Sequence, residues 1–582
     1  MEALIETRGL HKRFGDVHAV RGIALTVKRG TIYGLIGPNG AGKSTTLRML
    51  VDIIRPTNGT ITVLGRAPQK AKPELRRRIG YLPGEIKLTE RSSGESVLDH
   101  FKSISGTVAP GAVESLAERL DLDLHRPVRD LSKGNRQKLG LIQAFMHQPE
   151  LLILDEPTSG LDPLMQHEFL NLIREAQNNG QTVLLSSHIL GEIQHTADAA
   201  AVLAHGTIVA EGDIASLRIT GASRLRTVVT GTDARSLRSQ LEKHPELTEL
   251  EVREIGQSMV QVSGLLRGEP DSLIKTLSHY TIRSHPRGAG PRGIRPGTLR
   301  KHGDPLMTTS TARTADDRSA AFPILRWQLR SGIRGLIGWS LGLAVVLLLY
   351  LPVYPNVQTP QVSDMIDSLP QQMSGALGLD RIATGAGYTQ ATYFGLLGFL
   401  IAAMACIVWG SQFIAGAEES GRLELTMSHA VGRGQYALES LVTLVARALV
   451  LCATTIVGLL VLNGPSKLSL SVSNALTATI AWGALALACG VTALTVGAMS
   501  GRQNWAIGAG AAVCVAAYVF DAVAKTSTSL EWLSKLSPYH WAFGDDPLTT
   551  GHGWGGIALL CGFSVVLFVI GYLFFTRRDL HD

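Results

Sequence analysis

The sequence predicts an α/β domain with a small α+β lobe, followed by an all-α domain of six transmembrane helices. Residues 1–320 carry charge throughout, and at residues 31–50 an apolar strand pattern leads through a Gly-rich turn into a helical pattern. From about residue 335 the chain changes to long runs rich in Gly, Ala, Leu and Val. A bilayer-spanning helix needs roughly 20 mostly apolar residues, and these runs are long enough. The change in composition excludes a single domain.

Four segments are expected along the 582 residues. They are the α/β domain (1–215), the α+β lobe (216–284), a flexible linker (285–321) and the membrane domain (322–582). The linker is predicted from its Gly and Pro content. Residues 284–303 contain five basic residues and no acidic one: Arg287, Arg292, Arg295, Arg300 and Lys301. Beside a membrane such a run is attracted to anionic lipid headgroups.

Composition narrows the classes of function. The net charge of +7 could indicate nucleic acid, but much of the excess lies in the linker and no basic face interleaved with aromatic residues is present. Nucleic acid is therefore not an expected partner. The five cysteines fall in separate apolar runs without metal-ligand spacing, which favours small buried side chains: Cys406, Cys452, Cys489, Cys514 and Cys561. The first residues lack the apolar region of a signal peptide, so the N-terminal half is expected in the cytosol.

A phosphate-binding loop is predicted in "TIYGLIGPNGAGKSTTLRML", residues 31–50. The spacing Gly37-x-x-x-x-Gly42-Lys43-Ser44 fits the P-loop in full. Glycines let backbone N–H groups turn toward phosphates, Lys43 adds a point charge, and the Ser44 hydroxyl is a Mg²⁺ ligand. The residues expected to bind ATP here are Gly37, Pro38, Asn39, Gly40, Ala41, Gly42, Lys43, Ser44 and Thr45.

Two further strand ends carry polar residues suited to hydrolysis. "LLILDEP", residues 151–157, reads as a strand buried on both faces that ends in Asp155 and Glu156. Ligands bind at the carboxyl ends of such strands, so we expect Asp155 to hold Mg²⁺ through water and Glu156 to orient or deprotonate the attacking water. A surface acidic pair is the alternative, and it fits poorly after four apolar residues. His188 follows another apolar strand and is favoured as a γ-phosphate contact, although a lone His is usually structural.

"DLSKGNRQKLGLIQAF", residues 130–145, places Ser132 and Gly134 at the start of a predicted helix. Free backbone N–H groups at a helix start can bind an anion. The stretch occurs once, which raises the question of what supplies the other half of the site.

Together these motifs resemble the nucleotide-binding domain of ABC transporters over residues 4–215, with the motifs in family order. The resemblance implies an α/β P-loop NTPase fold of ABC type, with Phe14 stacking on adenine and Asp162 of "SGLD" in the D-loop. "LSKGN" matches the signature motif, in which Lys133 and Asn135 depart from the commoner Gly and Gln. Signature variants of this kind occur in drug and antibiotic exporters.

The resemblance also answers the question about Ser132 and Gly134. In this family the signature of one subunit closes over ATP held by the P-loop of another. One copy of each motif therefore implies a second copy of the chain, with two identical sites at a two-fold interface.

One position departs from the family. The Q-loop should carry Gln after "YLP", but Gly84 stands there and Glu85 follows. The family's role cannot be transferred, so either Glu85 reaches the metal or water fills the gap. We hypothesise that Glu85 substitutes in part as a Mg²⁺ ligand.

Residues 216–284 are expected to form a small βαββαβ-type lobe. Strand patterns are "RTVVTGT", "LTELEVREI" and "SMVQVSGL", and helix patterns are "DARSLRSQLEKH" and "EPDSLIKTLSHY". Similar lobes follow the nucleotide-binding domain in many drug-exporter relatives, and no chemistry is assigned to this one.

Six apolar runs are predicted to cross the membrane, at about 335–354, 391–411, 437–463, 473–499, 505–524 and 554–575. Arg residues flank the first span, lie between the second and third and between the fourth and fifth, and follow the sixth. By the positive-inside rule these flanks and both termini are cytosolic. Three lysines on the outer loops, Lys467, Lys525 and Lys535, are a weaker contrary signal.

Residues 321–335 are expected to form an amphipathic helix in the membrane interface. Arg326, Arg330 and Arg334 recur every four residues beside a row of apolar side chains, and Pro323 fits a helix start. A simple extension of the first span is the alternative.

The loop at residues 412–436 resembles the cytosolic loop of ABC-2 type permeases, where a short helix docks on the ATPase. We expect it to transmit ATP-driven closure, with Glu418 in the link; an ordinary solvated loop is the alternative. "KLSPYHWAFGD", residues 535–545, also resembles that family.

Three charges fall inside or near predicted spans. Glu439 is expected to snorkel near the cytosolic end of the third span, Arg447 lies deeper, and Asp521 is expected to be solvated. Intramembrane charges are functional candidates, but direct pairing of Glu439 with Arg447 would be long.

These features predict an ATP-driven exporter in the cell membrane that works as a homodimer with ATP and Mg²⁺. Its expected substrates are hydrophobic or amphipathic small molecules, because the family match is to exporters of drugs, antibiotics and lipids. A membrane sensor or resistance device that hydrolyses ATP and an ion exporter of the same permease class remain alternatives. A soluble ATPase acting on ribosomes is nearly excluded by the spans.

Overall fold

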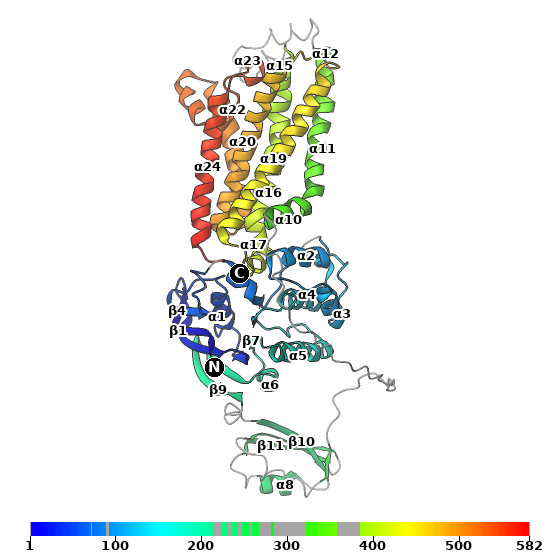
Figure 1. Cartoon of the computed structure of the whole chain (residues 1–582), viewed down its shortest axis with the longest axis vertical. Helices are drawn as coiled ribbons and strands as arrows, with labels where there is room; N and C mark the ends of the chain where they lie inside the picture. The colour runs from blue at the N-terminus through cyan, green and yellow to red at the C-terminus, as the bar shows by residue number, and fades with distance from the viewer. Residues whose placement is uncertain are drawn as a thin grey trace, which may run out of the picture.

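The structure is a computed structural model that describes residues 2–71, 73–88, 92–214, 223–230, 234–241, 247–256, 259–266, 281–283, 322–357 and 384–580. Figure 1 shows the membrane helices stacked end-on over the α/β domain, with the small lobe on the far side. The C-terminal end of the described chain lies where the membrane helices meet the α/β domain (Figure 1).

The α/β domain contains two sheets. An antiparallel sheet has the order β2-β1-β4, with β1 at Ala3–Phe14, β2 at Val17–Lys28 and β4 at Asn58–Val63. The second sheet has the order β5-β6-β7-β3-β8-β9, with strands at Ile79–Leu82, Leu151–Leu154, Thr182–Ser187, Ile32–Ile36, Ala199–Ala204 and Thr207–Asp213. Only β9 is antiparallel in that sheet. Every residue of β3, β6 and β7 is buried, as expected for parallel strands covered on both faces.

Helices cover these sheets. They are α1 (Lys43–Leu50), η1 (Pro73–Arg78), α2 (Gly94–Ile104), α3 (Ala112–Arg119), η2 (Val128–Asp130), α4 (Lys133–Phe145), α5 (Pro163–Asn178) and α6 (Leu190–Gln194). Three of them, α2, α4 and α5, begin at a side-chain cap. Ser93 caps α2 by accepting a hydrogen bond from the backbone N–H of Ser96. A short polar side chain there satisfies a backbone N–H that the helix itself leaves without a partner.

The small lobe is a four-stranded sheet of order β11-β12-β10-β13. Its elements are β10 (Ser223–Thr230), α8 (Ala234–Leu241), β11 (Leu247–Gly256), β12 (Met259–Leu266) and β13 (Thr281–Arg283). Leu237 and Leu241 of α8 pack on Val260 and Val262 of β12. The predicted helix at 269–280 and the linker at 285–321 lie outside the described residues.

Within the described residues, six helices are long and apolar enough to cross a membrane, in agreement with the predicted number. They run over Ile333–Asn356, Gly385–Glu419, Arg433–Asn463 (α19), Val472–Ser500 (α20), Gln503–Ala524 (α21) and Trp554–Arg577 (α24). The first comprises α11 (Ile333–Tyr350), η4 (Leu351–Val353) and most of α12 (Tyr354–Val357). The second comprises α15 (Gly385–Thr389), η6 (Gln390–Leu397), α16 (Gly398–Ser411), η7 (Gln412–Gly416) and α17 (Ala417–Glu419).

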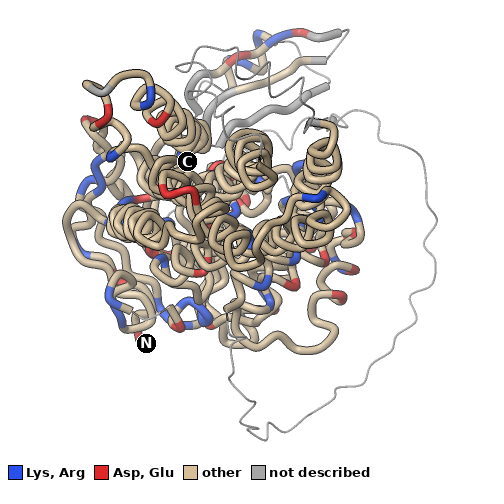
Figure 2. The backbone as a smooth tube through the Cα atoms, turned by 90° about the horizontal axis from the view of Figure 1, so that it is seen from above, with Lys and Arg blue, Asp and Glu red and all other residues tan. Residues whose placement is uncertain are grey.

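The fourth span, α20, forms the centre of the bundle. The most apolar part of α20 is 78% buried, whereas the same measure is 17% to 33% for the first, third, fifth and sixth spans. Small residues allow close approach: a Cβ on Gly490 would lie 2.8 Å from Cys406 of α16. Figure 2, viewed along the bundle, shows the helix tubes mostly free of charged residues. The fourth and fifth spans separate at Gly501, whose φ of +67° ends α20.

Shorter helices complete the membrane domain. They are α10 (Pro323–Ser331), α18 (Arg422–Ser428), η8 (Thr528–Leu536), α22 (Pro538–Phe543) and α23 (Pro547–Thr550). The predicted amphipathic helix is α10, which Gly332 separates from α11. Figure 1 shows α10 across the foot of α11 and beside α2 of the α/β domain.

Two expectations about charges in the membrane domain are corrected. Glu439 does not snorkel: it is 3% exposed and accepts hydrogen bonds from the backbone N–H of Leu325 and from Gln435. Arg447 donates to the carbonyl of Gln328, so both charges of α19 contact α10 and do not pair with each other, as their separation led us to expect.

Asp521 is the second correction. It was expected to be solvated, but it is 5% exposed and accepts a hydrogen bond from Lys525 at 2.7 Å. Its other carboxylate oxygen lies 3.2 Å from Nδ1 of His540. The Asp521 carboxylate is therefore buried beside His540, although the position of Asp521 near the end of a span predicted contact with water.

Candidate functional site

The P-loop joins β3 to α1 in a conformation that requires glycine. Gly40 and Gly42 have φ angles of +79° and +100°, which disfavour any side chain. A Cβ on Gly37 would lie 2.4 Å from the carbonyl of Leu203, and one on Gly42 would lie 2.6 Å from that of Ala19. The backbone is thus held close to its neighbours, while Pro38, Asn39 and Gly40 remain exposed at the tip.

Lys43 is buried among oxygen atoms at the start of α1. Its side chain is 5% exposed, and Nζ donates to the carbonyls of Gly37 at 2.8 Å and Pro38 at 3.3 Å. Nζ also lies 3.4 Å from a carboxylate oxygen of Glu156. Ser44 is exposed beside it and Thr45 is half-buried. The ammonium group is therefore fixed at the mouth of the loop, where it can meet an anionic phosphate.

Glu156 connects the predicted catalytic residues. Its second carboxylate oxygen lies 3.2 Å from Nδ1 of His188, so Glu156 stands between Lys43 and His188. Glu156 has a φ of +43°, and its backbone N–H donates to Ser186 at 3.0 Å. A strained backbone held by a neighbouring strand can fix a side chain in one orientation. A carboxylate in this position can accept a proton from water.

Asp155 is fixed one residue earlier. It is 2% exposed, and its carboxylate accepts a hydrogen bond from Ser186 at 2.5 Å. The Ser186 hydroxyl therefore contacts both acidic residues. It donates to the Asp155 carboxylate and accepts from the backbone N–H of Glu156. Our sequence reasoning missed Ser186, although its place at a strand end beside His188 was a usable signal.

The Q-loop position is packed against the acidic strand end. A Cβ on Gly84 would lie 3.0 Å from Oδ2 of Asp155. The carboxylate of Glu85 is 70% exposed and lies 3.8 Å from Lys87. Glu85 also lines a pocket with Glu419, Ser420 and other residues of the membrane domain. The structure therefore brings Gly84, and not the carboxylate of Glu85, to Asp155.

The signature residues lie at the start of α4. Ser132 caps α4 by accepting from the backbone N–H of Asn135, and a Cβ on Gly134 would lie 2.6 Å from the carbonyl of Gly160. Asp162 caps α5 in the same way, by accepting from two backbone N–H groups. Within the described residues, neither Ser132 nor Gly134 hydrogen-bonds a P-loop residue of its own chain.

Phe14 ends β1 and is 42% exposed. The ammonium group of Lys12 lies 4.8 Å from the centre of its ring. A half-exposed aromatic face at the edge of the domain can stack on a planar base.

The α/β domain is joined to the membrane domain through α18, which packs against β5. Glu424 of α18 accepts hydrogen bonds from Arg48 of α1, at 2.9 Å and 3.2 Å, and from the hydroxyl of Tyr81 at 2.9 Å. Burial and the charge of Glu424 raise the pKa of Tyr81 well above its usual value, so the phenol remains a donor. The helix that begins at Lys43 is thereby connected to the membrane domain.

The residue that makes this link differs from the expected one. Glu418, which we expected in the link, pairs with Arg578 after the sixth span and is 8% exposed. Glu424 carries the ion pair with the α/β domain instead. Both residues lie in the predicted loop, and only the packing of α18 distinguishes them.

The C-terminal end makes a second contact between the two parts. Asp579 pairs with Lys12 and accepts from the backbone N–H of Arg55 at 2.8 Å. Arg433, at the start of α19, donates to the carbonyls of Asp52 and Ile53. Two spans are therefore anchored directly to the turn that follows α1.

The fold and the site define a nucleotide-hydrolysing domain fused to a multi-pass membrane domain. Comparison with protein families gives the same division. The ABC transporter family model matches residues 20–159, and the model for the C-terminal domain of the multidrug efflux system permease Rv1217c matches residues 325–576.

Individual relatives match the first part. The bacitracin transport ATP-binding protein BcrA of Enterococcus faecalis is 36% identical over 37% of this chain and 71% of its own length. The daunorubicin resistance ATP-binding protein DrrA3 of Streptomyces coeruleorubidus is 38% identical over 39% of this chain and 74% of its own. A solved ATP-binding subunit of an ABC transporter is 31% identical to this chain. The match covers 37% of this chain and 92% of the solved one, with a TM-score of 0.35.

The chain belongs to the ABC transporter family. It hydrolyses ATP and couples that hydrolysis to transport, and its relatives include ATP-binding proteins of drug and antibiotic efflux systems.

Proposed function

We propose that the chain is a half-transporter that exports hydrophobic or amphipathic small molecules as a homodimer with two composite ATP sites. The observation that carries the proposal is the ion pair of Arg48 with Glu424, which joins the P-loop helix to the membrane domain. A movement of α1 on ATP binding would be passed directly to α18. Two relatives are named for bacitracin transport and for daunorubicin resistance, so bacitracin and daunorubicin are the first substrates to test.

In the proposed site, Glu156 is the general base and His188 contacts the γ-phosphate. The carboxylate of Glu156, held between Lys43 and His188, supports these roles. The residues proposed to bind ATP are Phe14, Gly37, Pro38, Asn39, Gly40, Ala41, Gly42, Lys43, Ser44 and Thr45 of one chain. Ser132, Gly134 and Asp162 would come from the partner copy, since within the described residues neither Ser132 nor Gly134 hydrogen-bonds the P-loop of its own chain.

Mg²⁺ fits the oxygen donors at this site. The Ser44 hydroxyl and the buried Asp155 carboxylate are hard oxygen ligands, which Mg²⁺ prefers. The ion would neutralise charge on ATP. Glu85 is retained as a third candidate, since its backbone follows Gly84 directly and its exposed carboxylate can rotate.

The proposed orientation places the nucleotide-binding domain and both termini in the cytoplasm of a cell-membrane protein. The arginine-rich flanks of the first, third and sixth spans support it, because cytoplasmic loops carry an excess of Lys and Arg.

Transport in sealed inverted vesicles tests the proposal. Vesicles with the unaltered chain are expected to accumulate daunorubicin or bacitracin only with ATP, and vesicles with Glu156→Gln are expected to accumulate neither. Equal ATP-dependent accumulation by the Glu156→Gln chain would contradict the assigned role. Accumulation of neither compound by the unaltered chain, together with accumulation of an inorganic cation, would contradict the substrate class.

A further inference from the structure

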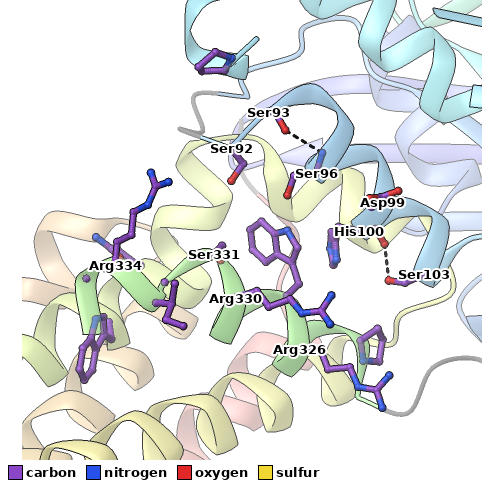
Figure 3. A pocket seen from close by; sticks show the side chains of 18 of the residues that line it. Ser92, Ser93, Ser96, Asp99, His100, Ser103, Arg326, Arg330, Ser331 and Arg334 are labelled. Carbon is purple, nitrogen blue, oxygen red and sulfur yellow. Dashed lines mark hydrogen bonds between the residues drawn. The ribbon is translucent and has the colours of Figure 1, made fainter. Parts of the chain in front are cut away.

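A second cavity lies away from the nucleotide site, where α2 meets α10 and the start of α11 (Figure 3). It encloses about 910 Å³. Serines of α2 form one wall, and the arginines of α10 and α11 form another. We propose that this cavity binds the phosphate group of an anionic lipid headgroup. The proposal concerns a binding site only and does not depend on the direction or substrate of transport.

The cavity carries a large excess of positive charge. Arg326, Arg330, Arg334 and Arg447 line it, whereas Asp99 is the one carboxylate among its described lining residues. Asp99 is already paired with Lys102 at 3.3 Å. Within the described part of the chain, the first three arginines have no ion-pair partner. Guanidinium groups bind phosphate oxygens through pairs of N–H donors, so the charge matches a phosphate.

Arg447 shows that the site is built into the fold and is more than a basic surface. Its side chain, 4% exposed, lies 5.2 Å and 5.1 Å from the ring centres of Trp409 and Phe413. One nitrogen donates to the carbonyl of Gln328, but Nε has no partner among the described residues. Burying a guanidinium beside a neutral carbonyl is costly, and an anion in the cavity would offset that cost.

The rest of the cavity wall adds neutral donors. Ser92, Ser93 and Ser96 line the cavity at the start of α2, where Ser93 caps the helix and Ser96 lies in its first turn (Figure 3). Burial lowers the pKa of His100 to about 3, helped by the charge of Arg422, so His100 is neutral and adds no further charge. Hydroxyl groups suit the outer oxygens of a phosphodiester and the glycerol hydroxyls of a headgroup.

An apolar stripe beside the cavity favours a lipid over a free phosphate ion. Ile333 lines the cavity itself, and the stripe continues along α11 with Ile337, Leu341, Val345 and Leu348. Their exposed fractions lie between 52% and 61%. Their spacing places them on one face of the first span. An acyl chain can lie along this face while its phosphate reaches the arginines.

Lipid binding to the purified full-length chain tests the proposal. The probes are dioctanoyl phosphatidylglycerol, dioctanoyl phosphatidylcholine, and inorganic phosphate, each titrated in detergent with native mass spectrometry as the readout. The variants are Arg326→Gln/Arg330→Gln, on exposed positions of α10, and Arg502→Gln as a matched control. Arg502 is also exposed and lies between the fourth and fifth spans.

We expect phosphatidylglycerol to bind the unaltered chain at least roughly tenfold more tightly than phosphatidylcholine, because each good charged contact contributes on that order. The double variant should lose that preference, and Arg502→Gln should keep it.

Three results would overturn the proposal. Equal phosphatidylglycerol binding by the unaltered chain and the double variant would exclude the arginines. Displacement of the lipid by inorganic phosphate at equal concentration would assign the site to the free ion. If the double variant became monomeric but still bound phosphatidylglycerol, the apolar face of α11 would be assigned to contact with the second copy of the chain.

Discussion

Arg48 in the last turn of α1 and Glu424 in α18 form a two-point ion pair between the P-loop helix and the membrane domain. The side chains are 17% and 16% exposed, so solvent screens the pair only in part. Tyr81 adds a third hydrogen bond to the same carboxylate. This contact gives the proposed transport cycle a specific mechanical link.

Glu424→Gln should separate ATP hydrolysis from transport. Charge-assisted hydrogen bonds of this kind contribute about 2 kcal/mol, which corresponds to roughly 30-fold in an equilibrium. We therefore expect transport per ATP to fall by about that order while ATP hydrolysis continues. Uptake and phosphate release in the same vesicles measure both quantities. Glu531→Gln, at an exposed position of η8, is the matched control. Unchanged transport per ATP in Glu424→Gln would exclude this contact as the link.

Glu156→Gln should remove most ATP hydrolysis. A general base contributes roughly 10²- to 10⁴-fold to rate, and Gln keeps the size of the side chain while it loses the basic oxygen. The kcat of the purified chain should fall within that range, with nucleotide binding retained. Glu114→Gln, exposed on α3, should have no effect. If Glu156→Gln kept more than about half of kcat, the base would have to be another residue.

The metal requirement discriminates between two explanations of the Q-loop. If Glu85 substitutes for the absent Gln, Glu85→Ala should raise the Mg²⁺ concentration for half-maximal ATP hydrolysis by several-fold. Gly84→Ala should also raise the Mg²⁺ concentration for half-maximal ATP hydrolysis. Here the cause is crowding of Asp155, because the added Cβ would lie 3.0 Å from its Oδ2. An unchanged Mg²⁺ requirement in Glu85→Ala, with a raised one in Gly84→Ala, would leave water as the substitute.

Acidification should lower the free energy of unfolding of the chain. Burial, the charge of Arg422 and the neighbouring His429 lower the pKa of His100 to about 3, whereas an unfolded His titrates near pH 6.5. Below about pH 6.5 the unfolded chain therefore binds a proton that the folded chain does not, which costs about 1.4 kcal/mol per pH unit down to the folded pKa. The melting temperature should fall between pH 6.5 and 4.

His100→Phe removes this titration. The ring of His100 lies 4.7 Å from that of Trp327, and its Nδ1 has no partner among the described residues, so an apolar ring is tolerated there. The melting temperature of His100→Phe should fall less steeply with acid than that of the unaltered chain. His552→Phe, at an exposed position, should leave the slope unchanged. Parallel slopes for the unaltered chain and His100→Phe would contradict the assignment.

The elements that carry the proposed ATP site were predictable because they follow short-range patterns. An apolar strand, a glycine turn and a helix start define residues 32–50, and buried strands end at Asp155 and His188. Hydropathy alone was sufficient to place the six spans.

Long-range partners were not predictable. The roles of Glu418 and Glu424 depend on how α18 packs, and the burial of Asp521 depends on His540, 19 residues away. Glu439 and Arg447 hold α10, which is more than a hundred residues earlier. No local pattern in the sequence encodes such neighbours.

The account depends most on the claim that each ATP site takes residues from two chains. ATP hydrolysis by purified mixed dimers tests it, with one chain carrying Lys43→Ala and the other carrying Ser132→Arg. A shared site predicts that the mixed dimer regains one intact site, and thus activity, although each variant paired with itself is inactive. A dimer of the unaltered chain with Lys43→Ala shows whether one intact site is enough. If that control is active and the Lys43→Ala/Ser132→Arg dimer is not, the ATP site belongs to a single chain.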